Sequence, residues 1–463
     1  MPFRTGHSRM TNIFSHYHLN DATWFVLSLL LILAVFFRFN RLWSLRNLDL
    51  LLLLAISPGL LFLTEEYRKV DSNAGYVWLF VCSGAILLRL FVDSRFKRRP
   101  PLDQNLNASG LGLLCVAAFA FQVTRVVTEP MPESTLATVQ VAGDMLRRQD
   151  TSRGGELTPK GESAKPVTGP ATRVVAAVGG VAPASMVAGA SGIRVEIIAA
   201  RLIACLSHLA VILGLIFLGR KHLGDVKLGV AMATLYLLMP STALKVSNVN
   251  HILPAAFVIW ALVYYHKPMV AGGLMGLACG TVFFPAFLLP LWMVFYGRQG
   301  SIRFGLALGI TAAVLLSTFA LTAADSQSFQ RQFVGSIDWS VLQLQTDLGL
   351  GFWSSDWIAY RLPVMAGFLV MVGVLAVFPR KKNIEHLMAH SAAIVVGTQL
   401  WYTQGGGVYV LWYLPLLLTV VFRPRLTHLV PPEATPLLKA ARQKSDEARK
   451  ERTFSSIDRH KLR

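Results

Sequence analysis

Cysteine is scarce in this sequence, and its positions exclude two classes of site. The 463 residues contain four cysteines, Cys82, Cys115, Cys205 and Cys279, and each lies within an apolar run. They have neither the spacing of a zinc-binding knuckle nor that of a secreted disulfide framework. We therefore expect small core residues at these positions, and no metal site.

Charged residues are also scarce in this sequence. Only 15% of the residues are charged, whereas 54% are hydrophobic. No P-loop, zinc motif or Ser/His/Asp arrangement rises above chance, which argues against the common soluble enzymes. This composition is typical of a polytopic membrane protein, so we expect an all-α polytopic fold with the bilayer as its main solvent.

Apolar runs long enough to cross a membrane recur along most of the chain. We expect about thirteen transmembrane helices, because a bilayer core of about 30 Å needs roughly twenty apolar residues per helix. The run 269–297 is too long for one helix, and Pro285 interrupts its hydrogen bonds, which predicts two short helices or a broken re-entrant pair. The expected spans are 22–38, 48–63, 75–92, 109–127, 195–218, 227–243, 251–266, 269–283, 284–297, 304–324, 361–378, 386–402 and 407–422.

Lysine and arginine gather in links that fall on one side of the predicted membrane. Short cytoplasmic links hold these residues preferentially, so this side, including the C-terminus, is expected to be cytoplasmic. The formal charge of +19 then indicates contact with anionic membrane lipid and not with nucleic acid. The basic segments are 94–101, 219–227, 297–303, 379–383 and the tail from Arg423.

Two outer connections are longer than the fold requires, at 128–194 and 325–360. In the first, Leu136, Val139, Met145 and Leu146 predict one helical face. The following stretch is rich in Gly, Ser, Thr and Pro, which predicts mobility, and the segment 173–192 is suited to lying at the membrane interface.

The second outer loop is rich in aromatic residues. Trp353, Trp357 and Tyr360 could anchor helices at the headgroup level. Alternatively, the ring of Trp353 could cover a sugar or an isoprenoid chain while Asp356 binds hydroxyl groups. The sequence leaves both interpretations open.

Polar side chains near the outer ends of the spans are candidates for chemistry. Glu129 and Glu133 are candidate bases, although solvated loop acids beside prolines would look the same. Arg194 and Arg201 are candidates for binding phosphate, because a guanidinium donates two hydrogen bonds at once. Arg125 and Lys245 need no functional role, because their long side chains can snorkel to the membrane interface. Further candidates for binding a sugar or phosphate are Asn248 and His251, with Asn250 favoured as a helix cap.

A diffuse resemblance connects these parts. The outer "NVNH" at 248–251, a span, a short "HKP" link and "AGGLMGLACGTVFFPAFLLP" at 271–290 resemble the GT-C superfamily of membrane glycosyltransferases. The similarity is closest to bacterial polyprenyl-phosphate-mannose-dependent mannosyltransferases. It covers roughly residues 109–422, and residues 194–300 carry its specific part. The sequence departs from the pattern at Val282, where a basic residue is usual.

The resemblance implies an enzyme of the bacterial inner (plasma) membrane. It would move a mannose-like sugar from a polyprenyl-phosphate donor to a hydroxyl of a lipid or glycan acceptor on the outer face. No cofactor is implied beyond that donor. Glu133 or Glu129 would be the base, where the family usually has aspartate.

The resemblance also implies a division of the chain. Residues 1–108 would be an N-terminal accessory three-helix membrane module, 109–422 the GT-C-like core, and 423–463 a basic cytoplasmic tail. Two alternatives remain: a non-catalytic membrane scaffold derived from such an enzyme, or an amphiphile transporter or flippase with broken helices.

Overall fold

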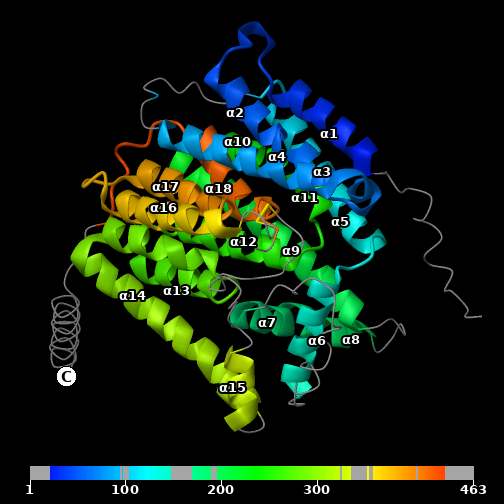
Figure 1. The fold of residues 1–463 in the computed structure, drawn as a ribbon, viewed down its shortest axis with the longest axis vertical. Helices are drawn as coiled ribbons and strands as arrows, with labels where there is room; N and C mark the ends of the chain where they lie inside the picture. The colour runs from blue at the N-terminus through cyan, green and yellow to red at the C-terminus, as the bar shows by residue number, and fades with distance from the viewer. Residues whose placement is uncertain are drawn as a thin grey trace, which may run out of the picture.

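The computed structural model describes residues 21–93, 96, 104–147, 169–188, 195–323, 326–334, 352–353, 358–402 and 405–432. Every regular element within these ranges is helical, and they contain no strand (Figure 1). The all-α prediction is therefore confirmed for the described part of the chain.

The helices follow the apolar runs of the sequence. Before residue 190 they are α1 (Asp21–Phe36), η2 (Phe39–Arg41), α2 (Leu45–Leu54), α3 (Ile56–Phe62), α4 (Glu65–Phe91), α5 (Ala108–Thr128), α6 (Glu133–Arg147), α7 (Pro170–Ala176), η5 (Ala177–Val181) and α8 (Ala182–Ala188). After it they are α9 (Val195–Leu218), η6 (Gly219–Leu223), α10 (Val226–Leu238), α11 (Pro240–Leu244), α12 (Val249–Val263), α13 (Pro268–Cys279), η7 (Phe284–Leu288), α14 (Leu289–Thr322), α15 (Ser326–Val334), α16 (Ile358–Val377), α17 (Ile384–Thr398) and α18 (Val410–Phe422).

Seven helical stretches of the described residues are long and apolar enough to cross a membrane, which supports an integral membrane protein. The expected count of about thirteen is not confirmed. Several predicted spans are helices of 10–17 residues, for example α10, α12 and α18. These are shorter than the roughly twenty residues that a full crossing needs.

The predicted break near Pro285 is confirmed. Helix α13 ends at Cys279, and the chain resumes as the 3-10 helix η7 with Pro285 in its first turn. A second break lies inside α14, where Gly297 has a positive φ of 62°. The rings of Trp292 and Phe304 lie 6.2 Å apart across it, whereas twelve residues of straight helix would span about 18 Å. The two arms of α14 therefore fold back on each other.

The small residues of α13 allow a close approach to the second arm of α14, as the sequence predicts. A Cβ atom added at Gly272 would lie 2.2 Å from the backbone oxygen of Phe304. At Gly276 an added Cβ would lie 2.9 Å from the Cβ of Thr311. The two helices run in the same direction at near backbone contact.

Helices α6, α7, α8 and α15 gather on the lower side of the molecule in Figure 1, away from α1 and α2. Helix α7 begins on the end of α13, where Gly169 N donates to Thr281 O (3.2 Å) and Ala171 N donates to Gly280 O (2.8 Å). The start of α7 in the connection 128–194 thus packs on the end of α13.

One expectation for that connection needs correction. Helix α6 exists, but it buries Thr135, Thr138, Val139 and Ala142, while Leu146 is 51% exposed, because the helix packs through its smaller side chains. The segment expected at the interface, 173–192, overlaps Pro170–Val187, which is long and apolar enough to cross a membrane, so its place in the membrane stays a prediction. The segment expected to be mobile lies almost entirely outside the described residues.

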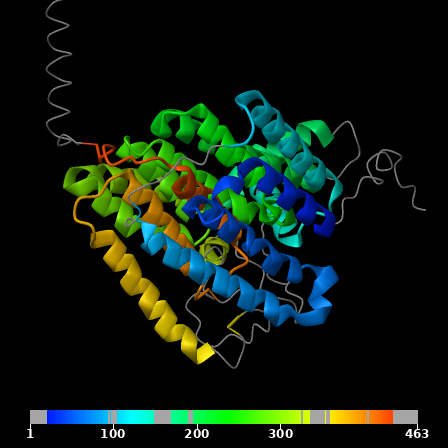
Figure 2. The ribbon, with the colours of Figure 1, turned by 90° about the horizontal axis from the view of Figure 1, so that it is seen from above.

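Helix α16 lies along one edge of the bundle (Figure 2). Its large apolar side chains Leu362, Val370 and Val374 are about half exposed or more. Such a face is suited to contact with lipid chains.

Candidate functional site

The backbone of the turn between α11 and α12, residues 245–251, is held in place by side chains of other helices. Three side chains from α9, α6 and α18 donate hydrogen bonds to carbonyl oxygens of this turn or its first helical residues. Since a carbonyl only accepts, the imidazole of His208 must carry its proton on Nε2. The bonds run from His208 Nε2 to Val246 O (3.0 Å), from Thr135 Oγ1 to Ser247 O (2.9 Å) and from Trp412 Nε1 to Asn250 O (3.1 Å).

Some side chains of the same region have buried polar atoms without partners among the described residues. Four buried polar atoms between residues 241 and 251 make no hydrogen bond: Ser241 Oγ, Ser247 Oγ, Asn250 Oδ1 and His251 Nδ1. Each such atom costs about 1–3 kcal/mol, so a cluster of them needs an explanation. A backbone fixed from three sides that presents unsatisfied polar groups is suited to binding a polar ligand.

His251 connects this turn to the broken helix pair through stacked rings. Its imidazole lies 4.7 Å from the ring of Tyr409, which stacks on Trp412 at 4.1 Å. Trp412 in turn stacks on Phe284 at 4.6 Å, at the start of η7. The aromatic column therefore joins the polar turn to the break after α13.

Lys245 adds a positive charge to the turn. Burial lowers the pKa of its ammonium from the ordinary lysine value. Lys245 and His251 interact electrostatically, although they are six residues apart. The turn therefore combines a cation with amide, hydroxyl and imidazole groups, which suits an oxygen-rich or anionic ligand.

Asn248 and His251, both predicted from the sequence, belong to this turn. Asn248 is the N-cap residue of α12, but its side chain makes no capping hydrogen bond. The expectation that Asn250 caps the helix is wrong, because Asn250 lies in the first turn, where its carbonyl binds Trp412. Sequence reasoning gave Lys245 a snorkelling role and did not single out the buried serines.

The two candidate bases have different surroundings. Glu129 follows α5 and accepts a hydrogen bond from Arg125 Nε, and Arg125 Nη2 also binds Asp21 at 2.7 Å. Glu133 begins α6 and is exposed. It lies two residues before Thr135, which binds the polar turn, so Glu133 is the better placed of the two acids.

The remaining predicted residues are dispersed. Arg201 is half-buried in α9, and its Nε makes no hydrogen bond. Trp353 is buried, donates to Leu400 O (3.0 Å) and packs against Phe80, so it does not form an exposed platform. Arg194 and Asp356 lie outside the described residues, and so does Trp357.

An apolar cavity of about 320 Å³ lies beside the broken helix pair. Its lining includes Gly276 of α13 and Gly280 just after that helix, Ala312 and Phe319 of α14, and Pro170 of α7. The guanidinium of Arg173 lies 5.6 Å from the ring centre of Phe319. A positive charge therefore lies beside Phe319, one of the residues that line this apolar groove.

Arg173 was missed by sequence reasoning. Its signal was a single basic residue in the apolar stretch 170–188, which was read as interfacial. Among the described residues, no group of His, Cys, Asp and Glu could hold a metal ion. Comparison with protein-family models, with curated proteins and with solved structures found no match to this chain.

Proposed function

We propose that the protein is an integral membrane glycosyltransferase that moves a mannose-like sugar from a polyprenyl-phosphate donor to a hydroxyl of a lipid or glycan at the outer face. The observation that carries the proposal is the apolar groove beside α13 with Arg173 next to its lining residue Phe319, on a helix that packs against α6. Helix α7, which bears Arg173, packs on α6, and α6 binds the turn through Thr135.

The groove is suited to an isoprenoid chain. Its lining residues are apolar or small, and it opens beside a break in the helices, where a chain in the bilayer has access. Beside Phe319 of this lining, the fork of Arg173 would donate two hydrogen bonds to the donor phosphate. Lys245, Asn248 and His251 would bind the sugar or the phosphate from the turn.

The proposed reaction gives each of these residues a role. The acceptor oxygen attacks the anomeric carbon while the bond from that carbon to the phosphate oxygen breaks. The acceptor proton passes to the carboxylate of Glu133, and the leaving polyprenyl phosphate takes the electron pair. Positive charge at Arg173 and Lys245 stabilises the phosphate as its charge grows.

The test is sugar transfer by the full-length protein in proteoliposomes. The donor is a synthetic polyprenyl-phosphate mannose with a labelled sugar, and the acceptor is lipid extract from the source cells. We expect Glu133→Gln to lower the transfer rate about 10²- to 10⁴-fold, the usual effect of removing a general base.

Glu129→Gln is the matched control. Its carboxylate is engaged by Arg125, so this variant should keep most of the transfer activity. Undiminished transfer by Glu133→Gln would remove this acid from the mechanism.

A second candidate is a scaffold that binds the same amphiphile without chemistry. The exposure of Glu133 favours it, because a general base is usually shielded from water. Binding of polyprenyl phosphate without transfer from several donor sugars would support this candidate. Movement of the amphiphile across proteoliposomes without sugar transfer would instead indicate a transporter or flippase.

A further inference from the structure

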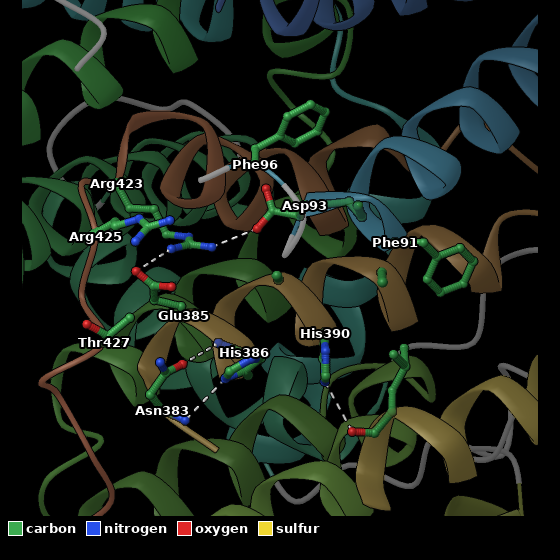
Figure 3. Close-up of a pocket in the computed structure, with 14 residues that line it drawn as sticks. Phe91, Asp93, Phe96, Asn383, Glu385, His386, His390, Arg423, Arg425 and Thr427 are labelled. Carbon is green, nitrogen blue, oxygen red and sulfur yellow. Dashed lines mark hydrogen bonds and ion pairs between the residues drawn. The ribbon is translucent and has the colours of Figure 1, made fainter. Parts of the chain in front are cut away.

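A second cavity, of about 240 Å³, lies at the other end of α17 (Figure 3). Helix α17 begins at Ile384 beside this cavity, and the side chain of Gln399, which follows it, accepts from Tyr409 N near the polar turn (3.3 Å). The fifteen residues of α17 span about 22 Å, so the two sites are distinct.

The carboxylates of this cavity are already neutralised. Asp93 accepts from Arg89 Nη1 (3.0 Å) and from Arg423 Nη2 (2.7 Å). Glu385 pairs with Arg423 Nη1 at 2.9 Å. Because each acid faces a guanidinium, the two acids form a rigid wall that repels an anion much less than free carboxylates would.

The uncommitted polar groups of the cavity include several hydrogen-bond donors. Arg425 and Thr427 are exposed, and within the described residues neither makes a hydrogen bond or an ion pair. His386 Nδ1 accepts from Asn383 N at 3.4 Å, so the neutral ring carries its proton on Nε2. Figure 3 shows Arg425 and Thr427 on the same side of the cavity as Arg423 and Glu385.

His390 also lines the cavity, where its Nδ1 donates to Leu375 O (3.1 Å). The remaining lining is apolar and adjoins exposed apolar side chains. Phe91 and Leu375 line the cavity at the ends of α4 and α16, two candidate spans. Phe91 is 44% exposed, and Phe378 just beyond α16 is 56% exposed. A ligand with a phosphate and an attached apolar chain could therefore place both parts here.

We propose that this cavity binds a phosphate group through Arg425, Thr427 and His386. Its source is the headgroup of an anionic membrane phospholipid, or free phosphate. The apolar rim favours the lipid, because only a lipid headgroup brings an apolar chain that could contact this rim.

The experiment measures binding by native mass spectrometry of the full-length protein in detergent. The probe is dioctanoyl phosphatidylglycerol, and dioctanoylglycerol is the same amphiphile without phosphate. Arg425→Gln should weaken binding of the phospholipid about tenfold, the value of one hydrogen bond to a charged group. Arg380→Gln is the matched control, an exposed arginine of the link 379–383 that does not line the cavity, and it should bind as the unsubstituted protein does.

The outcomes separate the sources. Displacement of the lipid by millimolar inorganic phosphate, lost in Arg425→Gln, would show a phosphate site that also accepts the free ion. Equal weakening by Arg380→Gln and Arg425→Gln would overturn the proposal, because it would indicate diffuse surface attraction. Equal binding of dioctanoylglycerol would also overturn it. None of these results depends on sugar transfer.

Discussion

Two adjacent glycines in α13 have different neighbours and should respond differently to substitution. A Cβ at Gly272 would lie 2.2 Å from the backbone oxygen of Phe304, which a side-chain rotation cannot relieve. A Cβ at Gly273 would have its nearest neighbour, Thr311 Oγ1, at 3.6 Å, an ordinary contact. Gly272→Ala should therefore lower the unfolding free energy by about 1–3 kcal/mol through overpacking.

Gly273→Ala is the control for this prediction. It should be neutral or stabilise by up to about 1 kcal/mol, because alanine loses less backbone entropy than glycine in a helix. Chemical denaturation of the two variants in the same detergent measures the difference. If both variants were equally stable, the contact between α13 and α14 would not be as close as 2.2 Å implies.

At the scale of single residues, the sequence showed the types of group and not their partners. The small residues of α13 and the polar character of Asn248 and His251 were predictable, because they flank a long apolar run. That His251 Nδ1 has no partner depends on His208, Thr135 and Trp412 holding the turn from distant helices. No local pattern contains that information.

At the scale of helices, proline and run length were good predictors of breaks but not of crossings. The chain breaks between α13 and η7, just before Pro285, as expected. The two arms of α14 match two separate predicted spans. The count of about thirteen crossings is not confirmed, because helix length in a packed bundle also depends on capping and on neighbouring helices. Helix α12, for example, has only 15 residues and is almost entirely buried by protein.

The groove between α13 and α14 gives a testable prediction at the scale of helices. Ala312 lines the groove and is exposed, whereas Ala313 next to it is equally exposed and does not line it. Ala312→Trp should fill part of the cavity of about 320 Å³ and weaken binding of a labelled polyprenyl phosphate at least about tenfold. The measurement is a titration in detergent.

Ala313→Trp introduces the same indole on the neighbouring face and should leave the affinity unchanged. If both variants bound as tightly as the unsubstituted protein, the isoprenoid chain would have to lie elsewhere on the protein. A loss in both would point to a general disturbance of α14.

At the scale of the whole molecule, ion pairs join the first helices to the last. Arg89 of α4 binds Asp49 of α2 through Nε (2.5 Å) and Nη2 (2.8 Å), and it also binds Asp93. Asp93 reaches Arg423 after α18, 330 residues further along the chain. A sequence-based boundary near residue 108 rests on the resemblance alone, whereas these buried ion pairs connect the N-terminal helices to the end of α18. Removing one partner would leave an uncompensated buried charge.

The arrangement of the basic links predicts which end of the molecule faces the cytoplasm. The links at 219–227, 265–267 and 297–303 lie close together. Lys221 Nζ lies 3.1 Å from His266 Nε2, and the hydroxyl of Tyr296, just before the third link, donates to Tyr265 O (2.7 Å). Positive links favour the cytoplasm, so the face that carries them, with the link 379–383, should be cytoplasmic and α6 should lie outside.

Cysteine labelling in intact cells tests this orientation. Gln140→Cys on the exposed face of α6 should react with a membrane-impermeant maleimide, whereas Lys381→Cys should react only after the cells are permeabilised. The unsubstituted protein gives the background from Cys205 and Cys279, which are half-buried. The reverse pattern would place Glu133 and the polar turn in the cytoplasm. A lipid-linked donor would then have to be used on the inner face, and the phosphate cavity beside α17 would face outward.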